Sequence, residues 1–208
     1  KGRLSIKTIS YQMSADRLFE AAHRIDQGEG LLHLQHGGNY GVCRAYSLGG
    51  LIEYNQHAFL TWGWKKHGDF EGRFAPFPAP QLGPWLRTHR TKSDRIMLVS
   101  GIVPFLPTRL ISNGELHCHG RRKDRVEFIA ALEPALQHKL LYRPYPQRVY
   151  GAEDSAYFKR LFPDVEQVGD QIRFFHEMRR CRLLVVDHPG LTLYQALAAG
   201  TPFVGYWT

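Results

Sequence analysis

The sequence of 208 residues has few cysteines and no long apolar run. Its three cysteines, Cys43, Cys118 and Cys181, are widely spaced and odd in number, which fits a reducing compartment better than a disulfide framework. No stretch approaches the roughly 18 apolar residues of a membrane span. The first dozen residues also lack the apolar core of a signal peptide. These absences predict a cytoplasmic protein, with the inner face of the membrane as the alternative location.

Several motif classes are missing as well. No Gly-Lys-Ser/Thr follows the glycine-rich segment at residues 36–41, so the chain has no Walker loop. The GxGxxG spacing of dinucleotide-binding folds is absent too, which argues against NAD as well as against ATP hydrolysis. The triplet His117-Cys118-His119 has no second cluster at ligand spacing. The sequence therefore predicts neither a metal nor a cofactor.

Acidic residues are fewer than basic ones: the chain has 27 Lys and Arg and 19 Asp and Glu, which gives a net charge of +8. Such a balance suits nucleic acid, an anionic membrane surface or a phosphorylated ligand. The basic residues are dispersed, and no RNA-binding or helix-turn-helix signature is present. We therefore expect no nucleic-acid partner, but a phosphorylated ligand and peripheral contact with an anionic membrane.

The most informative stretch is residues 181–208 at the end of the chain. A run of branched apolar residues at 183–186 predicts a strand buried on both faces. A helical pattern follows, ended by a glycine and a proline, and a second apolar run at 203–206 returns to the sheet. The residues expected together on one face of this helix are Leu193, Ala196 and Leu197. The stretch thus predicts a β-α-β unit.

The turn Asp187-His188-Pro189-Gly190 lies between that strand and that helix. Anions bind at such places, because free backbone N–H groups and the helix dipole both favour negative charge. Gly190 lets a ligand approach the backbone closely, and Thr192 can cap the helix. The turn predicts a diphosphate or nucleotide subsite, and a plain β-α connection is the alternative.

The middle of the chain extends this pattern. Strands are expected at 96–100, 138–142 and 165–168, separated by helical stretches. Such alternation predicts a parallel sheet with helices on both faces. Ligands of these sheets bind beyond the carboxyl ends of the strands. Ser100 and Arg143 fall at such ends, as does the turn before Gly190.

A proline-rich stretch at residues 67–94 predicts a semi-rigid linker between two domains, with an ordinary surface loop as the alternative. It separates residues 1–66, with strands expected at 31–35 and 59–64, from residues 95–208. The chain opens without a methionine and stops just after a strand. We therefore expect part of a longer enzyme, with the end of a first α/β domain and most of a second.

A glycine-rich loop follows the strand expected at 31–35. Histidine titrates near neutrality, so His36 has the chemistry of a general base. The flanking Gly37 and Gly38 leave room for a substrate hydroxyl to reach it. The alternative is that His36 only forms hydrogen bonds within its own loop.

These motifs resemble those of GT-B glycosyltransferases, surface-carbohydrate transferases and CDP-glycerol glycerophosphotransferases. The residues that carry the resemblance are Gln35-His36-Gly37-Gly38-x-Tyr40-Gly41, Thr61-Trp62-Gly63-Trp64, Arg143-Pro144-x-Pro146 and Asp187-x-x-Gly190-x-Thr192 with the apolar helix after it. The resemblance implies a GT-B-like α/β fold of two Rossmann-like domains with parallel sheets, the first incomplete. It places a nucleotide-activated donor on the second domain.

The same resemblance implies roles for individual residues. His36 would be the catalytic base, in an acceptor loop with Gly37, Gly38 and Tyr40. The donor and its phosphates would be held by Ser100, Arg143, Asp187, His188, Gly190, Leu191, Thr192 and Gln195. Gln195 stands where many GT-B enzymes carry a glutamate that binds ribose, so the donor recognised here can differ. For Arg143 a surface salt bridge is the alternative to a diphosphate contact.

The expected activity is transfer of a sugar or a polyol phosphate from a nucleotide-activated donor to a carbohydrate hydroxyl, in surface polysaccharide biosynthesis. One rival is a nucleotide-sugar 2-epimerase-like isomerase, which would need paired carboxylates near His36. The other is a non-catalytic nucleotide- or carbohydrate-binding module, which would bind the donor without consuming it.

Overall fold

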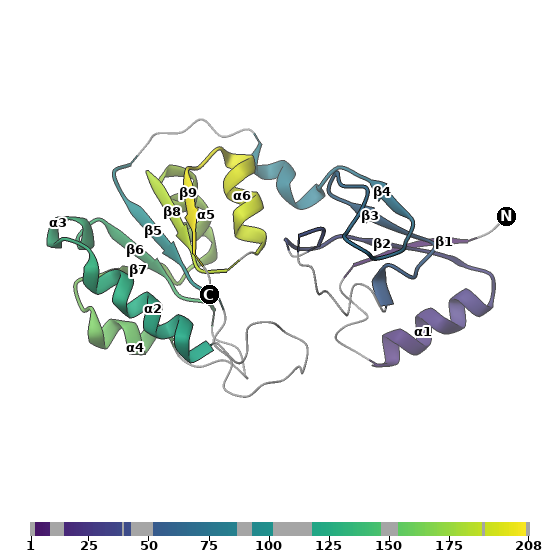
Figure 1. Ribbon diagram of the computed structural model, residues 1–208, viewed down its shortest axis with the longest axis horizontal. Helices are drawn as coiled ribbons and strands as arrows, with labels where there is room; N and C mark the ends of the chain where they lie inside the picture. The colour runs from purple at the N-terminus through teal and green to yellow at the C-terminus, as the bar shows by residue number, and fades with distance from the viewer. Residues whose placement is uncertain are drawn as a thin grey trace. The chain divides into compact units, whose positions relative to one another are not determined.

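The computed structural model describes residues 3–8, 15–38, 40–42, 52–86, 93–101, 118–146, 154–188 and 190–206. The chain divides into two compact units, Lys1–Pro84 and Trp85–Thr208, which are coloured purple to blue and teal to yellow in Figure 1. Each unit contains one parallel sheet. The predicted α/β class with two Rossmann-like units is therefore confirmed.

The first unit has four parallel strands in the order β1-β2-β3-β4. Their bounds are Leu4–Lys7, Gly30–Leu34, Ala58–Thr61 and Phe74–Pro76. Helix α1, Ala15–Asp26, connects β1 to β2 and packs Ala21 against Leu31 of β2 (Figure 1). The helix expected at 44–57 lies mostly outside the described residues.

The proline-rich stretch contributes to this sheet. Strand β4 pairs with β3 in parallel, Phe59 opposite Phe74, and a 3-10 helix, Pro80–Trp85, follows. The first unit thus extends through most of the stretch that the sequence predicts as a linker, and the division between units falls after Pro84. Proline is tolerated in β4 because the strand lies at the edge of the sheet.

The second unit has five parallel strands in the order β7-β6-β5-β8-β9. The strands are β5 (Ile96–Val99), β6 (Leu140–Arg143), β7 (Glu166–Gln167), β8 (Leu183–Val186) and β9 (Phe203–Gly205). The chain builds outward from β5 on one side, then returns to place β8 on the other. The direction of winding therefore reverses between β5 and β8, where α/β sheets hold their ligands.

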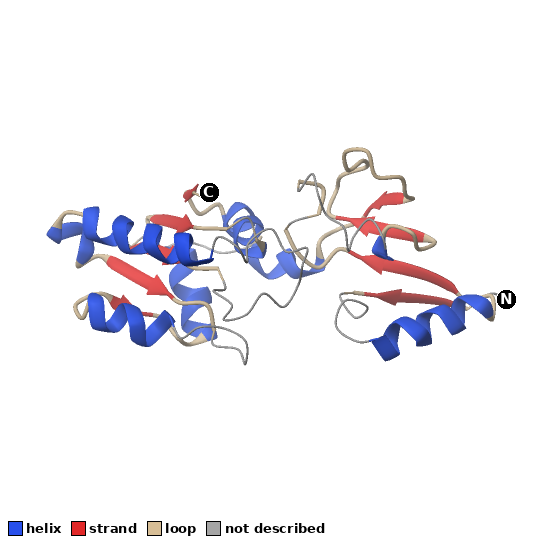
Figure 2. Cartoon of the chain, turned by 60° about the horizontal axis from the view of Figure 1, so that its bottom comes forward, coloured by secondary structure: helices blue, strands red, loops and turns tan. Residues whose placement is uncertain are grey.

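Helices cover both faces of this sheet (Figure 2). Their bounds are α2 (Cys118–Ala131), α3 (Pro134–Gln137), α4 (Asp154–Leu161), α5 (Gln171–Arg180) and α6 (Leu191–Ala199). On one face α5 and α6 bury Met178 and Ala196 against β5 and β8. On the other, α2 and α4 bury Ile129 and Phe158 against β5 and β6. Because both faces are covered, the central strands are apolar throughout, as predicted for β8.

Packing against the sheet decides which face of two helices is buried. Ile172 of α5 is 80 % exposed, and the buried stripe contains Phe174 and Met178, four residues apart. Of the residues expected together on one face of α6, Ala196 is buried, whereas Leu197 is 62 % exposed, because the buried stripe contains Gln195, Ala196 and Ala199. Apolar residues occur all around α6, so the sequence pattern alone did not fix its rotation.

Helix α2 begins at Cys118, so Asp124 lies inside the helix. Pro134 separates α2 from α3 and opens α3 at its first turn, where its missing N–H costs nothing. Among the described helices, none combines the length and the apolar character required to cross a membrane.

Candidate functional site

The loop that carries His36 is held by the buried side chain of Gln35. The Gln35 Oε1 atom accepts hydrogen bonds from the backbone N–H of Trp62 and from Nε1 of Trp64, both at 2.8 Å. Its Nε2 atom donates to the carbonyl of Gly37 at 2.8 Å. The two halves of the motif noted in the sequence therefore meet in space, with Gln35 as the residue that joins them.

Gly41 closes the loop against the same tryptophan. Its φ of +78° is unfavourable for other residues, and a Cβ atom there would lie 3.0 Å from the indole of Trp64. Among the loop residues predicted to bind an acceptor, Gly38 and Tyr40 are buried, whereas Gly37 is partly exposed. Gly37 is therefore the residue of the three with backbone open to a ligand.

His36 lies just beyond the carboxyl end of β2 and is partly exposed. Its Nδ1 atom lies 2.8 Å from the hydroxyl of Tyr40, whose ring meets the imidazole edge-on. Burial lowers the pKa of His36 below its ordinary value, against the opposing effect of the Glu53 carboxylate. A lowered pKa keeps the imidazole neutral near pH 7, which is the form that accepts a proton.

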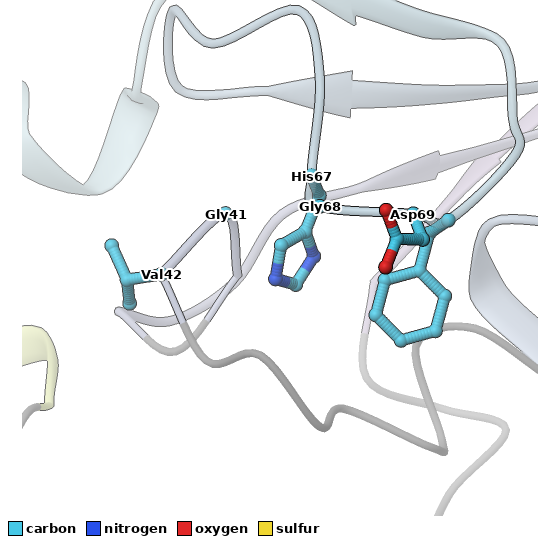
Figure 3. A pocket seen from close by; sticks show the side chains of 6 residues that line it. Gly41, Val42, His67, Gly68 and Asp69 are labelled. Carbon is cyan, nitrogen blue, oxygen red and sulfur yellow. The ribbon is translucent and has the colours of Figure 1, made fainter.

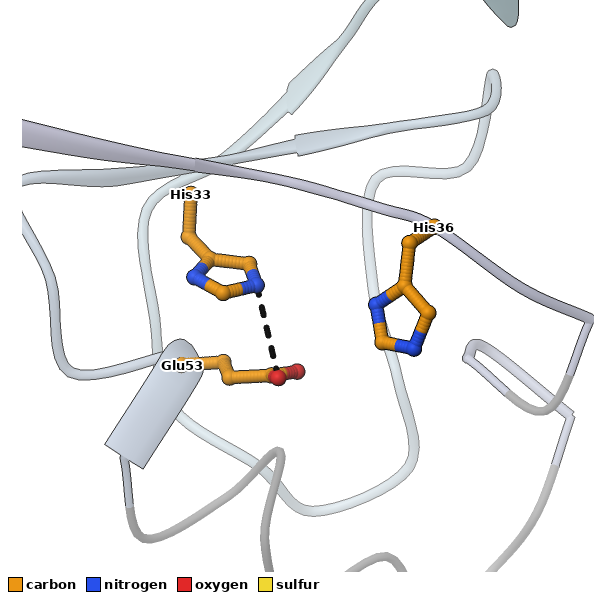
Figure 4. A group of neighbouring side chains, drawn as sticks. All are labelled: His33, His36 and Glu53. Atoms are coloured by element: carbon orange, nitrogen blue, oxygen red, sulfur yellow. Dashed lines mark ion pairs between the residues drawn. The ribbon is translucent and has the colours of Figure 1, made fainter. Parts of the chain in front are cut away.

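Two further titratable residues, His33 and Glu53, lie beside His36 (Figure 4). The His33 ring, on β2, stacks on Phe59, and its Nε2 atom lies 3.3 Å from Oε1 of Glu53. Both side chains are fully buried. One ligand atom from each of the three residues lies within 4.8 Å of the others, so the group can hold a metal ion.

A cavity of about 520 Å³ opens elsewhere in the first unit (Figure 3). It is lined by Gly41, Val42, His67, Gly68, Asp69 and Phe70. His67 Nδ1 lies 2.7 Å from the hydroxyl of Tyr54, and the Tyr54 ring packs against Tyr40, the partner of His36. The rings of Tyr54 and Tyr40 therefore connect His67, which lines the cavity, to His36.

In the second unit, Ser100 joins the carboxyl ends of β5 and β6. Its hydroxyl donates to the carbonyl of Arg143 at 3.2 Å and accepts from the backbone N–H of Tyr145 at 2.9 Å. The side chain is 1 % exposed. These contacts give Ser100 a positioning role at the sheet edge where it was predicted.

Asp187, at the end of β8, is fully buried and ties three segments together. Its Oδ1 atom accepts the backbone N–H of Gly101 at 2.7 Å, and its Oδ2 atom accepts a hydrogen bond from Nε of Arg125 on α2. Burial alone would raise the pKa of Asp187, but the His188 hydrogen bond and the Arg125 charge outweigh it and lower the pKa. The carboxylate therefore stays ionised within the protein.

Arg125 extends this network. Its Nη2 atom donates to the carbonyl of Gly101 at 2.9 Å, and its Nη1 atom pairs with Asp154 at the start of α4. Arg122 pairs with the second oxygen of Asp154 at 2.7 Å. Gly101, which follows the end of β5, is thus held through both its N–H and its carbonyl.

His188 lies between two glycines at this edge of the sheet. A Cβ atom on Gly101 would come within 3.0 Å of the imidazole Cγ, and one on Gly190 within 2.8 Å of Nε2. Nδ1 of His188 lies 3.1 Å from Oδ1 of Asp187, and the side chain is 25 % exposed. The ring therefore fits only because both flanking residues lack a side chain.

Helix α6 begins directly after this histidine. Gly190 is its N-cap residue in extended conformation, and no side chain caps the helix, so Thr192 does not serve as the cap. The backbone N–H groups of Leu191 and Thr192 belong to the first turn, where they have no partner within the helix. Gln195 is 8 % exposed, and Pro189 lies outside the described residues.

Arg143, at the end of β6, binds protein carbonyls. Its Nη1 atom donates to the carbonyls of Val168 and Gly169, and its Nη2 atom donates to Oε1 of Gln171 at 2.9 Å. Burial lowers the pKa of Arg143. The guanidinium ties β6 to the segment between β7 and α5, and its predicted contact with a diphosphate stays a prediction.

A sequence model described as the LIC12162 family transferase matches residues 1–208, the whole chain. The chain belongs to this family. Membership in the LIC12162 family establishes the chain as a transferase, in agreement with the coarse class of activity expected from the motifs. No curated protein matches the sequence significantly.

In this LIC12162 family chain, the residues that sequence reasoning missed are those that organise the two sites. Glu53 and His33 have no motif around them, and Arg125 sits in a basic run that reads as a solvated loop. A signal was available only for Gln35, whose place in the motif next to His36 was noted without a role. Contacts between distant segments revealed the others.

Proposed function

We propose that this transferase moves a sugar or a polyol phosphate from a nucleotide-activated donor to a carbohydrate hydroxyl, in the assembly of surface polysaccharide. The donor site lies on the second unit and the acceptor loop on the first, in the manner of GT-B enzymes. The observation that carries the proposal is the arrangement at the carboxyl ends of β5 and β8.

Three features of that edge favour a phosphorylated ligand. The edge is the point where the strand order reverses. The N-terminus of α6 presents backbone N–H groups without intrahelical partners. His188 stands beside that terminus, oriented by the ionised Asp187 and able to donate or carry a proton.

In the proposed reaction, the acceptor oxygen bonds to the transferred carbon, or to the phosphorus of a polyol phosphate donor. The bond from that atom to the nucleotide phosphate oxygen breaks, and the electron pair leaves with the nucleotide. His36 takes the proton of the acceptor hydroxyl. The α6 N-terminus and His188 stabilise the negative charge that grows on the departing phosphate.

The family match and this geometry support transfer over the rival functions. A 2-epimerase needs paired carboxylates, whereas the described neighbours of His36 offer one, Glu53. A binding module without activity would show donor binding but no release of nucleotide. We therefore follow both binding and turnover.

The test is a thermal-shift screen of the chain against UDP, GDP, CDP, CMP and ADP, followed by measurement of nucleotide release. A ligand at 100 times its Kd stabilises the native protein by about 2.7 kcal/mol, which raises the melting temperature by several degrees. We expect one nucleotide to act, and His188→Gln to abolish its effect. The exposed His138 of the second unit supplies the matched control, His138→Gln. Equal shifts in both variants, or no shift from folded protein, would refute this donor site.

A further inference from the structure

The group at the carboxyl end of β2 has the composition of a transition-metal site. We propose that His33, His36 and Glu53 bind a divalent transition-metal ion, with Zn²⁺ the best match. We further propose that the bound ion competes with the role of His36 as a base. The second part rests on the proposed function, and the first does not.

The distances fit such an ion. Zinc binds histidine nitrogen at about 2.0–2.1 Å and carboxylate oxygen at about 2.0–2.2 Å. Two ligand atoms of a tetrahedral site are then about 3.3–3.4 Å apart. The His33 Nε2 to Glu53 Oε1 distance is 3.3 Å, so one edge of the tetrahedron is already formed. All three ligand atoms lie within 4.8 Å of one another, so His36 needs only a small movement to complete the set.

The donor set selects the kind of metal. Two imidazoles and one carboxylate suit zinc and its neighbours, whereas calcium and magnesium prefer oxygen ligands alone. Three protein ligands leave a fourth position for water or another group, as in zinc sites that exchange ligands. Figure 4 shows the three side chains close together: His33 comes from β2, His36 from the loop just after it, and Glu53 from the short helical segment before β3.

Burial strengthens the argument. His33 and Glu53 are both 0 % exposed, and Phe59 covers one face of the His33 ring. A carboxylate in such surroundings is costly unless a positive charge accompanies it. A divalent cation between these side chains would bring positive charge next to the carboxylate, and the partly exposed His36 gives it a route to the site.

Tyr40, which is not one of the proposed ligands, also lies where a metal site needs a supporting residue. Histidine ligands of metals commonly donate their second ring N–H to a fixed acceptor, which orients the ring. The Tyr40 hydroxyl lies 2.8 Å from Nδ1 of His36 and 3.5 Å from Nε2, so it can accept the N–H of whichever ring nitrogen does not bind the ion. Loss of such an outer contact lowers metal affinity by about 10- to 100-fold, so Tyr40→Phe should weaken binding without abolishing it.

Competition follows from the chemistry of imidazole. The lone pair that accepts a proton is the one that binds a metal. An ion held by His36 therefore blocks the proposed proton transfer, and removal of the ion restores it. Metal occupancy would switch the acceptor site off while leaving the donor site on the other unit intact.

The experiment is a titration of the full chain, freed of metal with a chelator, first with Co²⁺ and then with competing Zn²⁺. We expect one ion per chain and the strong visible absorption of four-coordinate Co²⁺, lost when Zn²⁺ displaces it. His36→Gln and Glu53→Gln should each weaken binding by more than the roughly 100-fold upper range of an outer-shell change. His138→Gln, at an exposed histidine of the second unit, should leave binding unchanged.

Wild-type protein that binds no Co²⁺ or Zn²⁺ while folded would overturn the proposal, as would binding that survives both ligand variants. Because the Glu53 variant alters a buried pair, circular dichroism checks its fold, and the partly exposed His36 provides a variant that avoids this problem. Nucleotide binding by the second unit is measured separately. Metal binding without nucleotide binding would therefore leave this proposal standing while the proposed function fails. Turnover unaffected by a saturating ion would refute the competition.

Discussion

Removal of the buried Arg125 should destabilise the second unit more than any change to its surface charges. The guanidinium is 0 % exposed and faces two carboxylates, Asp187 and Asp154, as well as the carbonyl of Gly101. Arg125→Met keeps much of the side-chain length but leaves both carboxylates without their shared cation. This variant therefore tests whether the buried network of charges stabilises this edge of the sheet.

The expected magnitude follows from the partners that remain. Breaking a buried ion pair by removing one partner costs about 3–5 kcal/mol. Arg122 still pairs with Asp154, and the N–H of Gly101 still donates to Asp187. We therefore expect the lower end, about 3 kcal/mol. With a urea m value of about 1–3 kcal/mol/M, the unfolding midpoint should fall by roughly 1 M or more.

The assay is urea unfolding followed by hydrogen exchange resolved along the chain, because two units need not unfold together. The protection of backbone amides against hydrogen exchange should fall in the second unit and stay unchanged in the first. Arg173→Met is the control, since Arg173 and Glu166 form an exposed pair of the kind worth about 0–1 kcal/mol. The double variant Arg125→Met with Asp187→Asn should lose less than the sum of the single losses, since the two residues are in contact. A loss below about 1 kcal/mol for Arg125→Met would refute the reasoning.

Three other predictions follow from single contacts. Gly101→Ala and Gly190→Ala should each displace the His188 ring, cost about 1–3 kcal/mol of stability and weaken nucleotide binding, as measured by thermal shift; unchanged nucleotide affinity would contradict the proposed role of that ring. Gln35→Leu should remove the three hydrogen bonds that hold the His36 loop and cost about 1–3 kcal/mol of stability, which urea unfolding measures. It should also reduce turnover without changing nucleotide affinity, which enzyme kinetics can check. The pKa of Asp187 is lowered from its ordinary value of 3.8, so the stability that the ionised carboxylate contributes should be fully present above about pH 4 and be lost as the pH falls through the lower pKa of the folded state. Asp187→Asn should flatten this acid dependence, and an unchanged pH profile of stability would contradict the prediction.

The second unit shows how much a sequence can predict when one pattern dominates. Strand β8 begins and ends where the pattern placed it, at 183–186. Gly200 ends α6 in the left-handed conformation, with φ of +61°, as its position after the last apolar residue predicts. Buried parallel strands are uniformly apolar, and the helices between them end at clear stop signals such as glycine. The type and order of these elements can therefore be predicted from the sequence.

The sequence did not predict which face of each helix is buried, nor which residues the buried polar side chains contact. Leu197 points outward because α6 has apolar residues on several sides, and packing against the sheet decides which are buried. Glu53 and Arg125 carry no local signal, since what defines them is contact with residues far away in the sequence. The stretch 67–94 was predicted as a linker on its proline content, and Phe74–Pro76 within it forms β4 at the edge of the first sheet, where proline is accepted.

Both candidate sites place a partly exposed histidine over a buried carboxylate, and the two arrangements differ in a way that bears on function. Asp187 has a permanent cation, Arg125, so its charge is balanced inside the protein. Glu53 has two imidazoles near it instead. The edge proposed to bind the donor therefore offers a fixed arrangement of charge, of the preorganised kind that stabilises a phosphate. The His36 cluster can instead change its charge with a proton or a metal ion, which is the property that a base or a switch requires.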